Sequence, residues 1–123
     1  MPFQVRLNAT PPLVEAVFAG KLTPPELTAA AEGMLDLARK NAVYRVLADC
    51  TALEGGHSLF DLYALADFIF ASGLSNKIKE AVVLPLAAEA VEAVRFWEIT
   101  CKNRGILVKV CEDRQSAIDW LKE

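Results

Sequence analysis

The spacing of apolar residues divides the chain into short strands and longer helices. Residues 3–8 alternate apolar and polar side chains, and a second apolar segment, residues 13–19, follows a turn expected at Pro11 and Pro12. Together these segments predict a β-hairpin. Further segments rich in apolar and β-branched residues predict buried strands at residues 43–50, 80–85 and 106–111.

Segments with helical periodicity connect these strands. Residues 22–41 predict a helix in which Thr23 is the N-cap, Pro24 occupies the first turn and Glu26 completes a capping box. One side of this helix is apolar and is expected to face the sheet: Leu27, Ala30, Ala31, Met34, Leu37 and Ala38. Three further helices are predicted at residues 58–74, 87–103 and 113–122, the last with Asp113 as its cap.

The order of these elements, ββαβαβαβα, predicts one α/β domain over residues 1–123. Alternation of strands and helices favours a mostly parallel sheet of about five strands, because each helix returns the chain to the end of the sheet where the previous strand began. The domain therefore opens with a hairpin and is covered by about four helices. The pattern leaves the strand order open.

Charge and composition exclude several classes of protein. The chain is 54% hydrophobic with a net charge of −3, and its Lys and Arg residues are scattered apart from Lys77 and Lys79. Such a surface lacks the positive charge that nucleic-acid binding requires. The N-terminal residues show no secretion signal, and the longest apolar run, residues 81–88, contains Pro85 and is too short to span a bilayer. We therefore expect no integral membrane segment.

The three cysteines do not form a recognisable framework. Cys50, Cys101 and Cys111 are widely spaced, form no CxxC pair and are accompanied by a single histidine, His57. These spacings indicate neither a set of disulfides nor a zinc site, and each cysteine lies in an apolar stretch typical of a buried side chain. We expect a cytoplasmic protein without a metal or cofactor.

Three stretches carry a resemblance to a known family: GKLTPPEL at residues 20–27, YRVLADC at residues 44–50, and NRGILVKVCEDRQSAIDWL at residues 103–121. They resemble the SpoIIAA-like, or STAS, domains of anti-sigma factor antagonists, and especially the small stand-alone bacterial SpoIIAA-like proteins. The last stretch is similar to the family's closing pattern of a strand, an aspartate and AxxWL. The resemblance implies the SpoIIAA-like fold and a function in regulation.

The same resemblance implies a candidate phosphorylation site. In the antagonists of the family, a partner kinase phosphorylates a serine at the start of the helix after the central strand, within an Asp-Ser-Ser-Gly-like motif. Ser58 is the nearest counterpart here, but its region reads ADCTALEGGHSLFDLY, so the motif is absent and the loop is longer. The stand-alone relatives have also been likened to lipid-transfer domains.

The loop before the second helix allows two interpretations. Ser58 and Asp61 have the spacing of a helix cap. The same serine, with Gly55, Gly56 and His57, is a candidate phosphorylation or anion site at a helix N-terminus, and Thr51 beside Asp49 is a weaker candidate. His57 lacks a nucleophile and an orienting partner in the sequence pattern, so we expect no catalytic residues and no enzyme.

The helix at residues 58–74 is apolar on two sides. One side is expected to face the sheet: Leu62, Ala66, Ile69, Phe70 and Gly73. The opposite side is a candidate interface or apolar ligand patch: Phe60, Ala64, Phe68 and Ala71, with Ile99 of the next helix as a further member. The alternative is that loops or the terminal helix with Trp120 cover these residues.

Two functions from different classes remain. The first is a non-enzymatic regulatory module that acts by protein–protein contact, most simply as a homodimer through Phe60 and Phe68. The second is a carrier or sensor of a small apolar or lipid-like ligand, bound against the same helix. Asp61 and Asp67 beside the patch favour the first, since a surface that delivers lipid usually adds basic residues.

Overall fold

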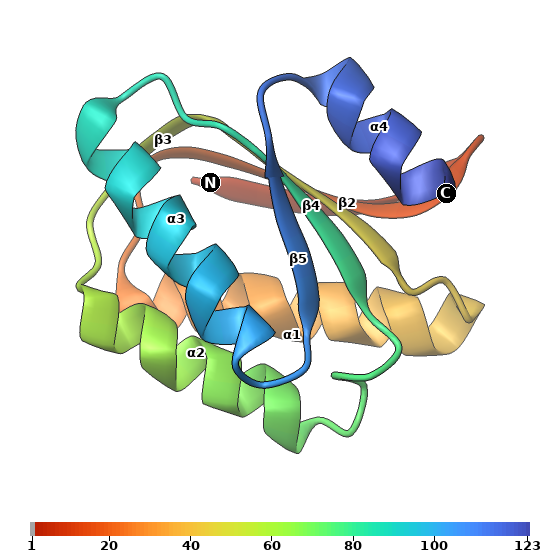
Figure 1. Ribbon diagram of the computed structural model, residues 1–123. Helices are drawn as coiled ribbons and strands as arrows, with labels where there is room; N and C mark the ends of the chain where they lie inside the picture. The colour runs from red at the N-terminus through yellow and green to blue at the C-terminus, as the bar shows by residue number, and fades with distance from the viewer. Residues whose placement is uncertain (1) are drawn as a thin grey trace.

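The computed structural model describes residues 2–123, and its elements follow the predicted order. The strands are β1 (Phe3–Ala9), β2 (Pro12–Lys21), β3 (Arg45–Gly55), β4 (Lys79–Val83) and β5 (Leu107–Cys111). The helices are α1 (Pro24–Asn41), α2 (Leu59–Ala71), α3 (Ala88–Lys102) and α4 (Arg114–Lys122). The predicted ββαβαβαβα order is thus confirmed (Figure 1).

The strands form one sheet in the order β1-β2-β3-β4-β5. β1 pairs with β2 in the antiparallel sense, and the other three pairs of neighbours are parallel. Every crossover advances in the same direction, so a common handedness places α1, α2 and α3 on one face of the sheet. The mostly parallel sheet with an N-terminal hairpin was predicted, whereas the strand order comes from the structure.

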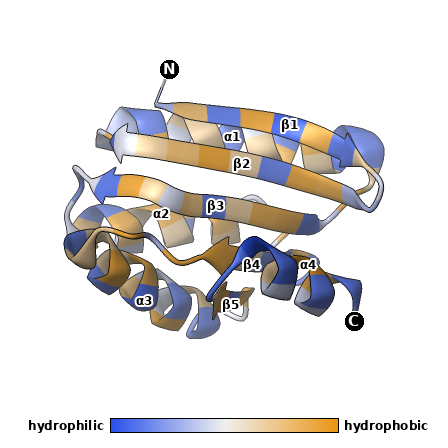
Figure 2. Ribbon diagram, turned by 90° about the horizontal axis from the view of Figure 1, so that it is seen from above, coloured by the Kyte–Doolittle hydropathy of each residue, from blue (hydrophilic) through white to orange (hydrophobic). Residues whose placement is uncertain are grey.

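The two faces of the sheet differ in how they are covered. Helices α1–α3 form a continuous layer over one face, while α4 alone lies on the other face, beside β3, β4 and β5 (Figures 1 and 2). The larger core lies under the three helices. The smaller core, under α4, is one cluster of buried side chains: Leu13, Leu47, Ala81, Val83, Cys111, Ala117 and Leu121.

Helix α1 begins and ends where the sequence predicts. The Thr23 hydroxyl accepts a hydrogen bond from the Glu26 amide, and the Glu26 carboxylate accepts one from the Thr23 amide at 2.8 Å. The helix ends after Asn41, where Ala42 takes a left-handed conformation with φ 52°. No helix within residues 2–123 has the length and apolar content needed to cross a bilayer.

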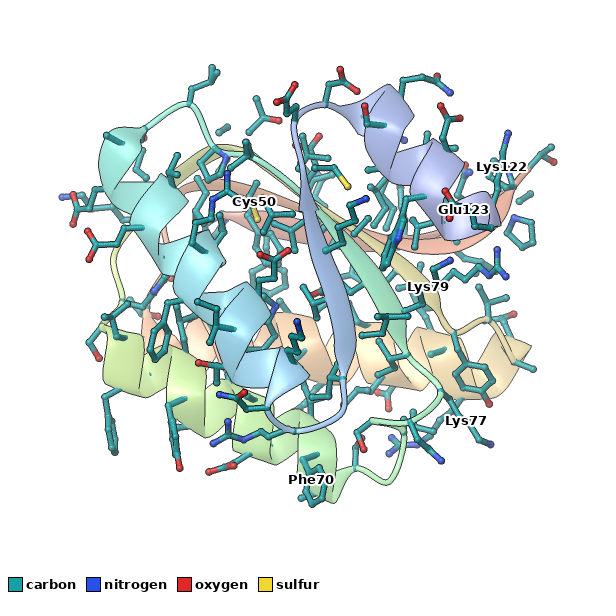
Figure 3. The ribbon with its side chains drawn as sticks, in the orientation of Figure 1. Cys50, Phe70, Lys77, Lys79, Lys122 and Glu123 are labelled. Carbon is teal, nitrogen blue, oxygen red and sulfur yellow. The ribbon has the colours of Figure 1, made fainter. Side chains whose placement is uncertain are left out.

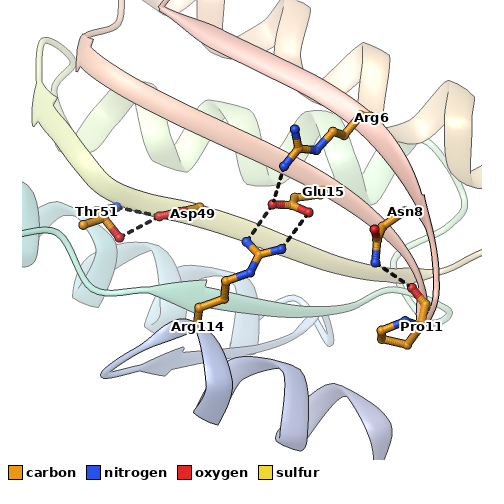
Figure 4. Close-up of polar contacts among 7 residues, drawn as sticks. All are labelled: Arg6, Asn8, Pro11, Glu15, Asp49, Thr51 and Arg114. Carbon is orange, nitrogen blue, oxygen red and sulfur yellow. Dashed lines mark hydrogen bonds and ion pairs between the residues drawn. The ribbon is translucent and has the colours of Figure 1, made fainter.

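Helix α4 is held to the sheet by polar contacts at both ends. In its first turn, Arg114 forms two hydrogen bonds with the carboxylate of Glu15 on β2 (Figure 4). In its last turn, Arg45 donates to the carbonyl of Leu121, and Lys79 donates to that of Trp120 at 2.8 Å. The cations at this end also complement the partial negative charge of the helix C-terminus.

Two boundaries differ from the prediction and change the surroundings of the loop before α2. β3 runs to Gly55 rather than ending at residue 50, because its additional residues pair with β2 as far as Lys21. α2 ends at Ala71 rather than residue 74, since the chain turns through Ser72 and Gly73, whose φ is +81°. The loop between β3 and α2 is therefore only three residues long, Gly56–Ser58.

Candidate ligand-binding site

Two glycines shape the short connection from β3 to α2. Gly55 and Gly56 have φ values of 113° and 94°, which residues other than glycine rarely adopt. A Cβ atom on Gly56 would lie 2.8 Å from the Leu22 nitrogen, so this loop packs directly on the one before α1. The Leu22 amide also donates to the Gly55 carbonyl at 2.9 Å. This packing holds the next residue, His57, at the edge of the helical layer.

Ser58 is the N-cap of α2, as the spacing with Asp61 predicts. The Ser58 hydroxyl accepts a hydrogen bond from the Asp61 amide at 3.1 Å, and the Ser58 amide donates to the Asp61 carboxylate at 2.7 Å. The bond from the Ser58 amide to the carboxylate is the main cause that holds the pKa of Asp61 below its usual value. The capping interpretation is confirmed, and a carboxylate already occupies the place that an anion would take. Phosphorylation of Ser58 stays a prediction.

Thr51 lies apart from Ser58. It belongs to β3, and its hydroxyl and amide both donate to the Asp49 carboxylate, at 2.6 and 3.0 Å (Figure 4). Asp49 is next to Ala48 and Cys50, which face the larger core, so the pair lies on the α4 side of the sheet. The structure therefore does not bring Thr51 together with the loop residues grouped with it in the sequence.

A cavity of about 70 Å³ lies between the sheet and the layer formed by α1–α3. Its wall consists almost entirely of apolar side chains from the strands and from all three helices, among them Phe18, Leu62 and Val94. A second void of about 20 Å³ adjoins it, and the same four residues line both: Met34, Ile69, Glu80 and Trp97. A dry engineered cavity of about 150 Å³ binds benzene, so the resting cavity suits only a few heavy atoms.

Glu80 is the unexpected residue in this cavity. It lies on β4 between Val46 and Val108 of the neighbouring strands, and 8% of it is exposed. Its carboxylate accepts a hydrogen bond of 2.7 Å from Trp97 Nε1, which is its one such partner among the described residues. Burial raises the pKa of Glu80 to about 7, although the Trp97 bond opposes that rise.

Glu80 was not among the predicted site residues, although its position in the sequence carries a signal. In the predicted strand, Glu80 and Val82 are two residues apart, so their side chains point to the same face of the sheet. A carboxylate in phase with the buried side chains of a central strand is rare unless it is paired. An unpaired carboxylate at such a position therefore indicates a polar group inside the apolar core.

His57 stands at another side of the cavity. Its ring is half-buried, and its Nδ1 atom is buried without a hydrogen-bond partner from residues 2–123. Burial lowers the pKa of His57, although the negative charges of Asp61 and Glu89 act in the opposite direction. The imidazole is therefore neutral at pH 7, with one nitrogen available to a molecule in the cavity.

The outer side of α2 is exposed, so the alternative that loops or the terminal helix with Trp120 cover it is wrong. α4 packs on the opposite face of the sheet, and 76% of Phe60 is exposed. The remaining predicted patch residues are also exposed: Ala64, Phe68, Ala71 and, on α3, Ile99.

Phe70 corrects the predicted sheet-facing side of α2. Leu62, Ala66 and Ile69 are buried, but Phe70 points away from the sheet with 54% of its surface exposed (Figure 3). The reason is angular, because successive helical residues differ by about 100° and Phe70 follows Ile69 directly. Gly73, grouped with the same side, lies beyond the end of the helix and is exposed.

A solved structure resembles this one along most of its length. It is an uncharacterized protein of the DUF3478 family with a SpoIIAA-like fold, from Shewanella loihica PV-4. The match has a TM-score of 0.60 and 21% identity, and covers 97% of this chain and 91% of that chain. The chain has a SpoIIAA-like fold. No protein-family model and no curated protein matches the sequence.

Within the SpoIIAA-like fold, the three cysteines are buried as predicted. Cys50 lies in the interior between the sheet and the helices (Figure 3), and Cys101 and Cys111 are also buried thiols. Burial raises the pKa of all three, which keeps them protonated and poorly nucleophilic at neutral pH.

Proposed function

We propose that this SpoIIAA-like domain is a non-enzymatic carrier or sensor that binds a small apolar or amphipathic molecule in the cavity behind α2. The cavity carries the proposal. Protein interiors are packed as densely as organic crystals, and an unfilled apolar void costs stability. A void that borders a buried carboxyl group and an unpartnered imidazole nitrogen is the pattern of a ligand site.

The wall formed by α2 gives a route into the cavity. Leu62, Leu65 and Ile69 of α2 line the void directly. α2 packs mainly on α3 and shares fewer contacts with α1. A small displacement of α2 from α1 would therefore enlarge the cavity without disturbing the sheet.

The absence of catalysis is part of the proposal. The Ser58 hydroxyl and one carboxylate oxygen of Asp61 are used in the helix cap, and His57 has no carboxylate partner within hydrogen-bonding distance among the described residues. A nucleophile with an adjacent base is therefore missing at this site.

Filling the cavity tests the proposal. Ala93 lines it, so Ala93→Leu places three carbon atoms in the ligand's space. Ala30 is equally small and buried in the same core but lies outside both voids, which makes Ala30→Leu the matched control. Native mass spectrometry of purified protein, with and without added 2-pentanone, should show a bound molecule in the wild type and Ala30→Leu but not in Ala93→Leu. Equal binding by all three folded proteins would contradict the proposal.

Protein contact through the outer face of α2 is the second candidate function. The exposed aromatic side chains of Phe60 and Phe68 support it, and Phe68 lines an open groove of about 260 Å³ against α1. Light scattering should show that the wild type self-associates and that a Phe60→Asp, Phe68→Asp variant is monomeric. Leu86→Asp is the control, because Leu86 is exposed and apolar but lies outside α2. A wild type that is monomeric would rule out the proposed homodimer.

A further inference from the structure

Glu80 occupies the junction of the two voids behind α2. It lines both, together with Trp97 of α3, Met34 of α1 and Ile69 of α2. Trp97 Nε1 donates to one carboxyl oxygen, Oε1, at 2.7 Å. The second oxygen has no hydrogen-bond partner among residues 2–123, so this end of the cavity holds an incompletely satisfied polar group.

The groups that face Glu80 favour its neutral form. The titratable side chains that sense the charge of Glu80 are the Cys50 thiol of β3 and the Cys101 thiol of α3, and His57 of the loop before α2 lines the same cavity. Burial keeps both thiols protonated and the imidazole neutral. α1 and α2 contribute only Met34 and Ile69 at the junction, and no cation shifts the pKa of Glu80. A neutral carboxylic acid presents an O–H donor on the oxygen that Trp97 leaves free.

We propose that Glu80 binds the polar end of the ligand, and that this end is an uncharged hydrogen-bond acceptor such as a ketone or ester carbonyl. The inference rests on the proposed function of the cavity. The carbonyl oxygen accepts the proton of the Glu80 acid, while the apolar part of the ligand extends between α2 and the sheet. Glu80 and Trp97 thus form the polar anchor of the site.

The surroundings disfavour charged ligands at the same position. A carboxylate ligand would bring a negative charge into an apolar cavity where, among the described residues, no cation shifts the pKa of Glu80. An ammonium ligand would require two ions to lose their water in an apolar cavity, which costs more than their attraction returns unless further hydrogen bonds satisfy them. An uncharged carbonyl group loses the least hydration and completes the single missing hydrogen bond.

The affinity for a simple ketone tests the assignment. We would titrate 2-pentanone into the Trp120→Phe protein, in which Trp97 is the remaining fluorophore of the two tryptophans. Because only the acid form donates, binding should weaken about 30-fold between pH 6 and pH 8.5 for a group that titrates near 7. Glu80→Gln keeps a donor and an acceptor, so it should bind at both pH values with the affinity of wild type at pH 6. Glu80→Leu should bind about tenfold more weakly.

Titrations with pentane and pentylamine distinguish a failure of the proposed cavity function from a failure of the role assigned to Glu80. Failure of pentane, 2-pentanone and pentylamine alike to bind would refute the proposed function of the cavity. Binding of pentane and 2-pentanone with equal affinity at both pH values would leave the cavity as a ligand site and overturn the role of Glu80. Pentylamine that binds more tightly at pH 8.5 would show that the anion is the active form, which also overturns the assignment. Any pH dependence that persists in Glu80→Gln belongs to His57.

Discussion

Each face of the sheet buries one glutamate, and the two glutamates have opposite surroundings. Glu15 lies on the α4 side with 1% of it exposed, and Glu80 lies on the side of α1–α3 with 8% exposed. Arg114 forms two hydrogen bonds to Glu15, at 2.7 and 3.0 Å, and Arg6 adds a third at 3.2 Å (Figure 4). Within the described part of the chain, Glu80 has a single hydrogen-bond partner, the indole of Trp97.

The difference separates a structural contact from a candidate binding group. The Arg114 and Arg6 guanidinium groups hold the pKa of Glu15 below its usual value, although burial acts against them. This fully paired carboxylate ties the start of α4 to β2. Burial raises the pKa of Glu80 instead, and its unused oxygen borders a void. Burial alone therefore does not indicate function, whereas burial without a complete set of partners does.

The largest expected effect comes from leaving Glu15 without its cations. In Arg6→Met, Arg114→Met, a buried carboxylate has no partner, and we expect the free energy of unfolding to fall by about 3–5 kcal/mol. Urea denaturation at pH 7 measures the change. Arg104→Met is the control, because its partner Asp67 is exposed and stays hydrated when the largely covered Arg104 is replaced, so we expect a loss of about 0–1 kcal/mol. A loss of only about 0–1 kcal/mol in the double variant would show that the Glu15 ion pairs do not hold α4 to the sheet.

The two glutamates should give stability opposite dependences on pH. Glu15 has a lowered folded pKa, so its contribution is present above the unfolded value of 4.5 and is lost as pH falls further. Glu80 has a raised folded pKa, so its contribution is complete below 4.5 and is lost as pH rises through about 7.

Glu80→Gln should therefore stabilise the protein at high pH. A shift of the pKa from 4.5 to about 7 corresponds to about 3 kcal/mol, which the amide avoids because it cannot ionise. Urea denaturation from pH 5 to pH 9 should show wild-type stability declining across this range, and a flatter profile for Glu80→Gln with a gain of about that size at pH 9. Parallel profiles for the two proteins would mean that Glu80 is not the titrating group.

The smallest expected effects come from the helix caps on the two faces. Ser58 caps α2, a wall of the cavity, and Asp113 caps α4 on the other face. Replacing either residue by Ala should cost about 1 kcal/mol of stability. Only Ser58→Ala should also speed the entry of 2-pentanone, since α2 borders the cavity and α4 does not. Equal association rates for wild type and Ser58→Ala, measured by stopped-flow fluorescence, would show that the cap of α2 does not control entry into the cavity.

The order of elements could be predicted because local signals determine it. The capping box of Thr23 and Glu26 and the alternation of β1 depend only on neighbouring residues. The end of β3 was predicted five residues early, since the pairing of Leu53 and Gly55 depends on the distant strand β2. The apolar outer face of α2 followed from helical periodicity, and its exposure is a consequence of α4 crossing to the other side of the sheet.

The cavity and both buried glutamates could not be predicted in the same way. Glu15 and Arg114 are 99 residues apart along the chain, so no local pattern pairs them. The void depends on how side chains from three helices pack over the sheet, which periodicity does not describe. Each glutamate left only a trace, as a charged residue in phase with an apolar one, Glu15 with Leu13 and Glu80 with Val82.

The indole resonance of Trp97 tests the central claim most directly. In 15N-labelled Trp120→Phe protein, the Trp97 Nε1–H group donates to Glu80, so its chemical shift reports the titration of that carboxyl group. We expect a midpoint near pH 7. Addition of 2-pentanone at ten times its dissociation constant should raise the midpoint by about one pH unit, because the ketone binds only the acid form. A midpoint that does not move with the ketone, or a resonance that does not respond between pH 5 and pH 9, would contradict the account.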